Sequence, residues 1–295
     1  MDIIKSPETH EKNAVIKGTL YLVGTPIGNL SDLSERAKKV LSEVDFIAAE
    51  DTRVSGAMLS KFGIKKPLCS YYEHNKKQKG EGIAERLAAG ESCALVTDAG
   101  MPAISDPGED IVRLCAERGI PVSVIPGPCA AVSALAVSGL FTGKFAFEGF
   151  LPTASGDRRE AIEEVKTEKR TLIFYEAPHK LQNTLKDLTD AFGPERRISL
   201  CRELTKLHEQ ILRMTLGEAL AYYTENDPRG EYVLILEGAA EASVEALTLE
   251  DAVSLALERI ASGASKKDAV REVSRETGFP KNALYDAVLR MQNAD

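Results

Sequence analysis

The sequence predicts an α/β protein with two α/β domains and a small C-terminal all-helical module. Short apolar runs alternate with amphipathic helical segments over residues 18–127, and a second series of this kind begins near Lys144. Glycines and prolines cluster directly after several of the apolar runs. Beyond Gly238 only helical periodicity is found. Strands that alternate with helices are typical of a mostly parallel sheet covered by helices.

Composition limits the class of protein. The chain has 295 residues, of which 43% are hydrophobic, so two or three domains with real cores are expected. No apolar run approaches the roughly 20 residues that a membrane span needs. The first residues lack a long apolar segment and a cleavage signal, so we expect a cytoplasmic protein with a flexible tail at residues 1–17.

Charge and the spacing of cysteines and histidines argue against a general nucleic-acid coat protein and against a metalloprotein. The net charge of −8 argues against a general nucleic-acid coat, although it leaves room for a local basic patch. The five cysteines show no CxxC spacing and the four histidines show no HExxH pattern. We therefore expect no metal site.

The first α/β domain is expected to cover residues 18–142. Its strands are predicted where apolar β-formers gather, at residues 18–24, 44–52, 66–72, 92–98 and 121–127. A helix is expected to begin at Asp32, because Glu35 stands three residues later and would complete a capping box. Further helices are expected at residues 82–90 and 109–119, each closed by a glycine.

The second α/β domain is expected to cover residues 143–239. Strands are predicted at residues 144–152, in TLIFYE before Pro178, and at residues 196–204 and 231–238. A charged helix is expected in GDRREAIEEVKTEKR, and another helix after Pro178.

The C-terminal module is expected to cover residues 240–295. ALTLEDAVSLALERIAS predicts one helix, and two more helices flank TGFP. The spacing of these two helices resembles a helix–turn–helix nucleic-acid module, and residues 264–292 carry six basic against four acidic side chains. A helical cap or a dimerisation element is the alternative interpretation.

Four turn-rich loops predict a ligand site. TPIGN, DAGMPAISDPG, PGPCAA and EAPHK each follow a predicted strand, and ligands of open α/β sheets bind beyond the carboxyl ends of strands. Glycines in these loops permit close backbone approach and prolines hold the loop shape. GTPIGN is not GxGxxG and no GxxxxGK[ST] occurs, so a nucleoside phosphate is not expected. The loops predict a rigid cleft between the two domains.

The same loops belong to a set of ordered motifs. LVGTPIGNLSDLSERA, AAEDTRVSGAML, VTDAGMPAISDPG, VIPGPCAA, FEGFLP, FYEAPHK and CRELTKLHE occur in this order over residues 18–238. In these motifs the chain resembles the ribosomal RNA small subunit methyltransferase I family, which has the tetrapyrrole-methylase fold, and its C-terminal helices resemble that family's extension. Met101 and Cys129 depart from the threonine and serine that the family more often has, at similar side-chain size.

The resemblance implies S-adenosylmethionine as methyl donor and the ribose 2′-hydroxyl of a cytidine in small-subunit (16S) rRNA as acceptor. It also implies small-subunit rRNA or the 30S subunit as partner, and a homodimer. Carried over by motif, the donor contacts would be Pro26, Asp98, Ala99, Gly100, Met101, Ile104, Cys129, Ala130, Glu176, Ala177 and Leu204. Asp98 would pair with the donor's ammonium group, with an Asx turn or a helix cap as the alternative. Asp106 is expected to be a turn residue or a helix cap.

Catalytic and RNA-binding candidates follow from the same loops. A general base for the ribose hydroxyl would be Asp51, Glu203 or Lys206, the last only if its pKa were strongly lowered, and Glu50 and His208 are further candidates beside them in the sequence. The loop at residues 71–80 offers Tyr71, Tyr72 and His74 for base stacking. The expected phosphate contacts are Arg53, Lys76, Lys77, Lys79, Lys266, Lys267 and Arg271. Each of these side chains has a salt-bridge or solvated-surface role as its alternative.

Two other functions remain open from the sequence. A tetrapyrrole C-methyltransferase would share the fold and the donor, but it would favour an apolar macrocycle pocket and would not need the helical module. A non-catalytic sensor would bind DNA through the C-terminal helices while the α/β part binds a metabolite.

Overall fold

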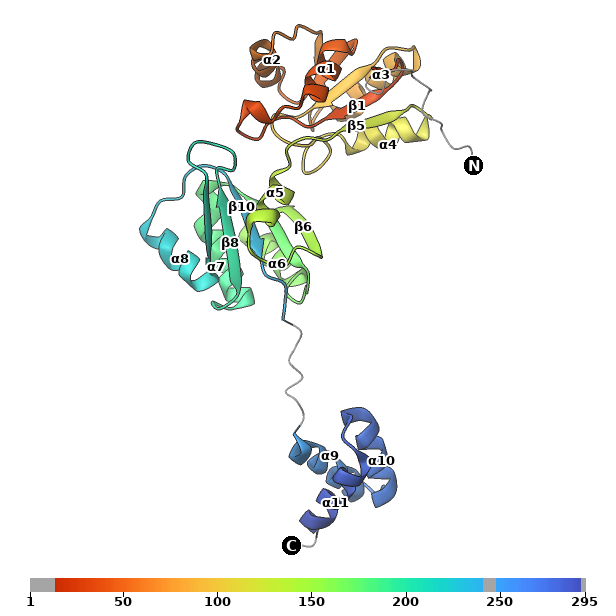
Figure 1. Ribbon diagram of the computed structural model, residues 1–295, viewed down its shortest axis with the longest axis vertical. Coiled ribbons are helices and arrows are strands. Elements are labelled where there is room, and N and C mark those ends of the chain that lie inside the picture. Colours follow the sequence, from red (N-terminus) through yellow and green to blue (C-terminus); the bar gives the residue numbers. More distant parts are fainter. Residues whose placement is uncertain (1–13, 241–247, 293–295) are drawn as a thin grey trace. The chain divides into compact units, whose positions relative to one another are not determined.

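The computed structural model describes residues 14–240 and 248–292 (Figure 1). The chain forms two compact units, of which the first ends at Gly238 and the second begins at Ala239. The first unit holds two five-stranded sheets, and the described part of the second consists of helices. The predicted fold class is therefore confirmed. Within the described residues, no helix has the length and apolar character needed to cross a membrane.

Most of the predicted N-terminal tail (1–17) lies outside the described residues, which begin at Ala14. The backbone N–H of Ile16 donates to the Tyr21 hydroxyl at 2.8 Å, and Lys17 pairs with Asp45 at 2.7 Å. This last part of the expected tail therefore contacts the first sheet region.

The first sheet is parallel throughout, in the order β3-β2-β4-β1-β5. Its strands are β1 (Leu20–Val23), β2 (Phe46–Ala49), β3 (Leu68–Ser70), β4 (Cys93–Val96) and β5 (Val122–Ile125), and each lies inside a predicted strand. All residues of β2 and β4 are buried, as expected for strands covered on both faces. The helices of this lobe are η1 (Leu30–Asp32), α1 (Glu35–Glu43), α2 (Thr52–Lys61), α3 (Lys76–Ala88) and α4 (Glu109–Glu117).

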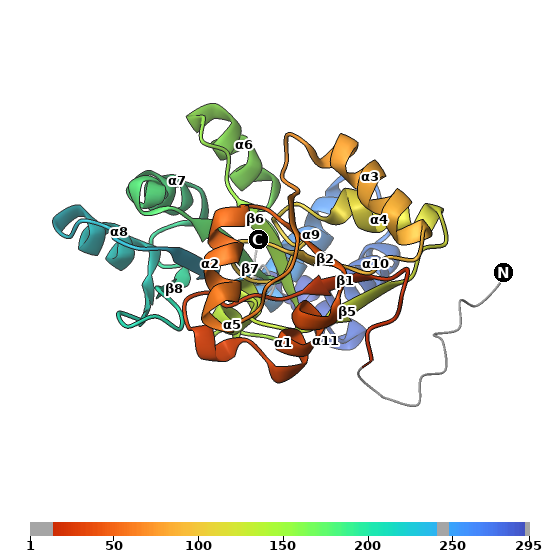
Figure 2. The ribbon, with the colours of Figure 1, turned by 90° about the horizontal axis from the view of Figure 1, so that it is seen from above.

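The two faces of this sheet have separate cores. Tyr21 and Val23 pack with α1 and α2 on one face, whereas Leu20 packs with α3 and α4 on the other. Figure 2 shows the two helix pairs on opposite sides of the strands. The alternation along β1 therefore fixes which helices lie on which face.

Three local predictions for this lobe were wrong or incomplete. The N-cap of α1 is Ser34, whose hydroxyl accepts the Ala37 N–H at 3.1 Å, because Asp32 ends a short 3-10 turn instead. Helix α2 was not predicted. Helix α3 begins at Lys76, so the lysines of the expected 71–80 loop lie in the first turns of a helix.

The second sheet has the order β6-β7-β10-β8-β9, with β6 and β7 parallel and the other pairs antiparallel. Its strands are β6 (Phe145–Phe150), β7 (Thr171–Glu176), β8 (Arg197–Arg202), β9 (Gln210–Thr215) and β10 (Tyr232–Leu236). Its helices are α5 (Ala130–Val137), α6 (Ser155–Glu164), η2 (Pro178–Lys180), α7 (Leu181–Phe192) and α8 (Leu216–Glu225). Strand β9 and helices α5 and α8 were not predicted.

Helix α5 connects the two lobes. It follows β5 of the first sheet but packs its alanines and Leu135 against Ile173, Val233 and Ile235 of the second sheet. The opposite face of that sheet is covered by α6, α7 and α8. Because α5 follows β5 in the chain but packs on the second sheet, the residues at its start lie between the two sheets.

The second unit contains α9 (Leu249–Ala261), α10 (Lys266–Thr277) and α11 (Lys281–Gln292), which share a core of their own. Thr248 and Asp251 form a capping box at the start of α9, and the Ser265 hydroxyl caps α10. Gly278 ends α10 in the left-handed conformation at φ +77°. The predicted helices flanking TGFP are therefore present.

Candidate functional site

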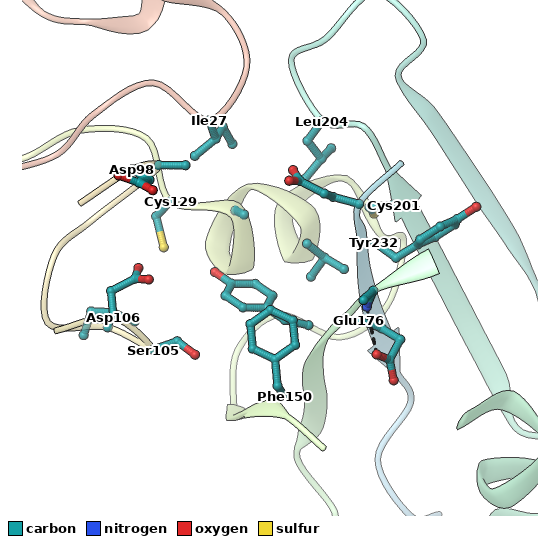
Figure 3. Close-up of a pocket in the computed structure, with 18 of the residues that line it drawn as sticks. Ile27, Asp98, Ser105, Asp106, Cys129, Phe150, Glu176, Cys201, Leu204 and Tyr232 are labelled. Carbon is teal, nitrogen blue, oxygen red and sulfur yellow. Dashed lines mark hydrogen bonds between the residues drawn. The ribbon is translucent and has the colours of Figure 1, made fainter. Parts of the chain in front are cut away.

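A cavity of about 550 Å³ lies between the two sheets of the first unit (Figure 3). The first lobe lines it with loops that follow the carboxyl ends of β1, β2 and β4, and α5 contributes its first residue. The second lobe lines it with the ends of β6, β7 and β8 and the start of β10. Because β10 is antiparallel to its neighbours, Tyr232 lies beside both Glu176 and Arg202 at this edge. The cavity therefore lies where ligands of open α/β sheets bind.

The loops after β1 and β4 are joined by their backbones. Thr25 N–H donates to the Gly100 carbonyl at 2.9 Å, and Gly100 N–H donates back to the Thr25 carbonyl at 3.1 Å. The Thr25 hydroxyl, fully buried, donates to the Thr97 carbonyl at 3.1 Å. The loops after β1 and β5 also touch, since a Cβ on Gly24 would lie 2.7 Å from the Gly127 Cα. These glycines are needed for the close approach of three loops.

Unusual backbone conformations flank the cavity on both sides. Among the described residues, the non-glycine residues with positive φ are Ala103 and Ser105 after β4, and Glu203 and Thr205 after β8. Such conformations cost on the order of 1–3 kcal/mol each and persist where packing holds them. Their location indicates that both loops are held in a defined shape at the cavity.

One wall of the cavity is acidic. Glu50, Asp98 and Asp106 line it, and the Asp98 carboxylate accepts the Asp51 N–H at 3.1 Å. Burial raises the pKa of Asp106 to about 6, with further contributions from Glu50 and Asp98. Burial also raises the pKa of Glu50, as do the charges of Asp98 and Asp51. A cationic ligand would relieve this repulsion.

The predicted cap role of Asp106 was wrong. Helix α4 has Gly108 as its N-cap and receives no side-chain cap, whereas Asp106 lines the cavity beside Ser105 (Figure 3). The positive φ of Ser105, 63°, precedes this turn of the chain. Asp106 therefore marks the cavity rather than the start of a helix.

Another wall is aromatic and was not predicted. Tyr175 lies edge-to-face against Phe150 at 5.4 Å and against Phe147 at 5.0 Å between ring centroids. Its hydroxyl accepts the Ala131 N–H at the start of α5, at 3.2 Å, and burial raises the pKa of Tyr175 to about 12. Phe150 is 56% exposed although it lines the cavity, so its ring is available to a ligand.

The structure brings together all of the predicted donor-binding residues except Pro26, whose neighbour Ile27 lines the cavity instead. Glu176 is the most constrained of them. Its carboxylate accepts the Ala177 N–H at 2.8 Å and the Thr184 hydroxyl at 2.5 Å. The side chain of Glu176 therefore ties β7 to α7, and its exposure is only 4%.

Of the candidate bases, Glu50 lines the cavity, whereas Asp51, Glu203, Lys206 and His208 do not. Asp51 caps α2 and binds Arg53, whose hydrogen bonds lower the pKa of Asp51 to about 2. Glu203 accepts hydrogen bonds from Lys206 at 2.9 Å and from the Glu231 backbone N–H at 3.0 Å.

Lys206 does not have the lowered pKa that a general base would need. Burial alone would lower its pKa, but hydrogen bonds to Glu231 and Glu203 outweigh burial and raise the pKa of Lys206 above its ordinary value. A raised pKa keeps the amine protonated near neutral pH. Lys206 is therefore an ion-pair partner in this structure rather than a base.

The predicted RNA-binding side chains have different surroundings. Tyr71 is fully buried, so its predicted stacking role was wrong, whereas Tyr72 is 41% exposed and lies edge-to-face with His74. Lys76 pairs with Glu73 at 2.7 Å and with Asp110 at 2.8 Å. Arg53, Lys77, Lys79, Lys267 and Arg271 are exposed and Lys266 is half-buried, while Arg271 pairs with Asp268 at 2.9 Å. In the described parts of the chain, no cluster of side chains suited to a metal ion is found.

Comparisons with known proteins agree with this geometry. A profile for Tetrapyrrole (Corrin/Porphyrin) Methylases matches residues 19–220, and a profile for the RsmI C-terminal HTH domain matches residues 247–292. The solved uroporphyrin-III-C-methyltransferase from Thermus thermophilus superposes with a TM-score of 0.51 at 21% identity, over 74% of this chain and 94% of its own. A cobalt precorrin-4 methyltransferase superposes over the same shares, with a TM-score of 0.54 at 16% identity. Fold and cleft together define a methyltransferase of the tetrapyrrole-methylase class.

Curated relatives narrow the class. The ribosomal RNA small subunit methyltransferase I of Halalkalibacterium halodurans is 48% identical to this chain, over 92% of this chain and 94% of the relative. The corresponding protein of Escherichia coli O157:H7 is 45% identical over 96% of this chain and 99% of its own length. The protein of the same name from Synechocystis sp. is 44% identical, over 93% of this chain and 99% of its own length. The chain belongs to the ribosomal RNA small subunit methyltransferase I family.

The cofactor of this family is S-adenosylmethionine, and the cavity fits it. A volume of about 550 Å³ is within the roughly 300–1,000 Å³ of small-molecule sites. The acidic wall suits a molecule that carries a sulfonium and an ammonium group. Ile27, Met101 and Leu204 add apolar surface to the cavity.

Proposed function

We propose that this enzyme transfers a methyl group from S-adenosylmethionine to the ribose 2′-hydroxyl of a cytidine in 16S rRNA. The observation that carries the proposal is the C-terminal unit. The two tetrapyrrole-methylase structures match 74% of this chain while using 94% of their own length. The alignments with the rRNA methyltransferase relatives cover 92–96% of the chain. The profile of the RsmI C-terminal HTH domain matches the C-terminal unit at residues 247–292. A quarter of the chain thus lacks a counterpart in the tetrapyrrole enzymes.

The residues of the cleft would act mainly by positioning. S-adenosylmethionine, when bound, supplies a methyl carbon that is already activated by its sulfonium. Asp98 and Asp106 would hold the cationic part of the donor, and the backbone bridge between Thr25 and Gly100 fixes the loop that carries Asp98. Orientation of this kind can contribute roughly 7–11 kcal/mol.

A general base would add about 10²–10⁴ in rate. Because Asp51, Glu203 and Lys206 are engaged with other partners, we infer that the proton acceptor belongs to the carboxylates that line the cavity.

The pH dependence of donor affinity tests the acidic wall. Asp106 is charged above its pKa of about 6 and neutral below it. A cationic donor is attracted to the charged form, so donor affinity is expected to be full near neutral pH and to fall about tenfold as the pH is lowered through 6. Calorimetric titration of Asp106→Asn should show weaker binding at pH 7.5 and a flatter pH profile. Glu50, Asp98, Tyr175 and His179 also line the cavity and remain in the variant. An unchanged profile in Asp106→Asn would exclude Asp106 from the donor site.

Acceptor choice tests the function itself. Labelled donor should transfer its methyl group to small subunits that lack the modification and not to uroporphyrinogen III. Transfer to the tetrapyrrole instead would support the alternative C-methyltransferase. Tight binding of duplex DNA without any methyl transfer would support the metabolite sensor. The proposed site of action is the cytoplasm, where ribosomal subunits are present.

We also propose that the enzyme is a homodimer. Strand β5 lies at the edge of the first sheet and exposes Val122 (38%) and Val124 (50%). Three further apolar side chains are exposed, namely Val132 on α5 (52%) and, beyond it, Phe141 (68%) and Phe145 (42%). An open strand edge with exposed apolar side chains favours association with a second copy. Light scattering at micromolar concentration should give the mass of two chains, and the mass of one chain would contradict this proposal.

The exposed cations are proposed to meet rRNA phosphates. In the first lobe these are Arg53, Lys77 and Lys79, and in the second unit Lys267 and Arg271, to which we add the half-buried Lys266. Lys76 contributes less, because its ammonium group already pairs with two carboxylates.

A further inference from the structure

We propose that a second hollow, beside the donor cavity, binds nucleotides of single-stranded RNA that flank the methylated residue. The inference rests on the proposed function and extends it to a site outside the predicted RNA-binding residues. The hollow has a volume of about 340 Å³ and lies between the end of β8, the start of β9, the C-terminal half of α8 and the loop before β10.

The hollow is contiguous with the donor cavity. Tyr232 lines both, and its ring points away from the donor cavity (Figure 3). Arg202, at the end of β8, pairs in register with Tyr232 at the start of β10. An RNA strand that places one ribose in the donor cavity would therefore pass its neighbouring nucleotides over this edge of the sheet.

Two arginines supply the charge. The Arg202 Nε donates to the Arg229 carbonyl at 2.5 Å, which fixes the loop before β10. In the described parts of the chain, neither guanidinium forms an ion pair, unlike Arg53, Arg158 and Arg170. Guanidinium groups with free N–H donors suit bidentate recognition of phosphate.

Tyrosine rings supply a stacking platform. Tyr222 is 39% exposed and lies edge-to-face on Tyr223, with ring centroids 4.9 Å apart. Tyr223 lies in the same way on Tyr232, at 5.8 Å, and both of these rings are buried. The Tyr232 hydroxyl accepts the Arg229 N–H at 3.2 Å. The exposed ring is therefore held by a rigid aromatic row, and exposed aromatic faces beside arginines are typical of single-stranded RNA sites.

Acidic side chains restrict what the hollow accepts. Glu225 and Asp227 also line it, so its charge is balanced and it does not suit a compact cluster of phosphates. Carboxylates can accept hydrogen bonds from the exocyclic amino groups of bases. One or two nucleotides, with base and phosphate together, fit this chemistry better than a free polyanion.

Substitutions of Arg229 and Tyr222 test the hollow. Arg229→Gln removes the charge but keeps the backbone groups that contact Arg202 and Tyr232, and Tyr222→Ala removes the exposed ring. Arg197→Gln is the matched control, because Arg197 lies at the opposite end of β8 and pairs with Glu237 at 3.5 Å. Anisotropy of a fluorescein-labelled oligocytidylate gives the RNA affinity, calorimetry gives the donor affinity, and thermal melting verifies folding.

We expect Arg229→Gln and Tyr222→Ala each to weaken oligocytidylate binding about tenfold. Arg229→Gln should also flatten the log–log salt dependence by about 0.7. KM for unmodified small subunits should rise by a similar factor, while kcat at saturation and donor affinity stay at the Arg197→Gln values. The RNA affinity of Arg229→Lys should lie between those of the wild type and Arg229→Gln, because lysine keeps the positive charge but loses the bidentate guanidinium.

The proposed RNA site in the hollow, but not the proposed function, would be overturned by one result. In that result Arg229→Gln and Arg197→Gln show equal oligocytidylate affinity and equal salt slope, while the wild-type enzyme still methylates subunits. A raised KM for subunits with unchanged oligocytidylate binding would overturn it too, in favour of a ribosomal protein contact. Wild-type enzyme that neither binds oligocytidylate nor methylates subunits would overturn the proposed function, and the hollow with it.

Discussion

Gly100→Val is expected to weaken S-adenosylmethionine binding about 100-fold, equivalent to ~2.7 kcal/mol, while the first sheet stays folded. Gly100 has φ +85°, a conformation that a β-branched residue resists. Its N–H and carbonyl both bond to Thr25, so a backbone that relaxes the strain must break this bridge. The loop that carries Asp98 and Asp106 along the cavity would then move.

A clash of the added Cβ atom is not the cause of this effect. A Cβ at Gly100 would lie 3.5 Å from the Ile27 side chain, which is an ordinary contact. Gly63→Val is the matched control, because Gly63 has a similar φ of +71°, open space around it and no place in the cavity. Calorimetry should show near-normal donor affinity for Gly63→Val. If Gly100→Val binds the donor as tightly as this control, the loop after β4 does not hold the donor.

Removal of the C-terminal unit is expected to weaken binding of the small subunit on the order of 100-fold at physiological salt. A chain ending at Gly238 loses Lys266, Lys267 and Arg271. The core of the second unit is formed within residues 252–288, so the truncation does not open the cores of the first unit. Donor affinity and turnover at saturating subunit should therefore be retained. The log–log salt dependence should flatten by about 0.7–0.9 for each phosphate that these side chains no longer bind.

Filter binding of labelled subunits at several salt concentrations measures both quantities. Equal affinity and equal salt slope for the full and truncated chains would make the second unit a structural cap. Loss of turnover at saturating subunit would instead place part of the catalytic geometry in that unit.

The strands could be predicted because the first sheet is covered on both faces. Residues 93–96 read as a short apolar run between turn-rich segments, and all of them are buried. Helix α5 was missed because its eight residues are apolar or small all round, so that even its exposed face, with Val132 and Val137, lacks the polar side chains that mark an amphipathic helix. Strand β9 was missed because it lies at the edge of the second sheet and has no fully buried residue.

The site was predicted in part for a similar reason. Glycines and prolines mark loops locally, and the ordered motifs assigned those loops to the donor. Side-chain partners cannot be found in this way when they are far apart in sequence. Lys206 meets Glu231 across 25 positions, and this contact, together with the local one to Glu203, raises the pKa of Lys206. Tyr175 reaches the start of α5 across 44 positions, so its place in the cavity depends on how the lobes pack.

The central claim is methylation of one ribose hydroxyl in 16S rRNA, and mapping of the transferred methyl group tests it most directly. Small subunits that lack the modification would be incubated with enzyme and tritiated S-adenosylmethionine, and their rRNA digested to nucleosides. We expect the label in 2′-O-methylcytidine from a single position, and far less of it when Gly100→Val replaces the wild-type enzyme at a donor concentration below the dissociation constant of the variant. Label on a base, in several nucleosides, or absent from rRNA while uroporphyrinogen III is methylated, would contradict the proposed function.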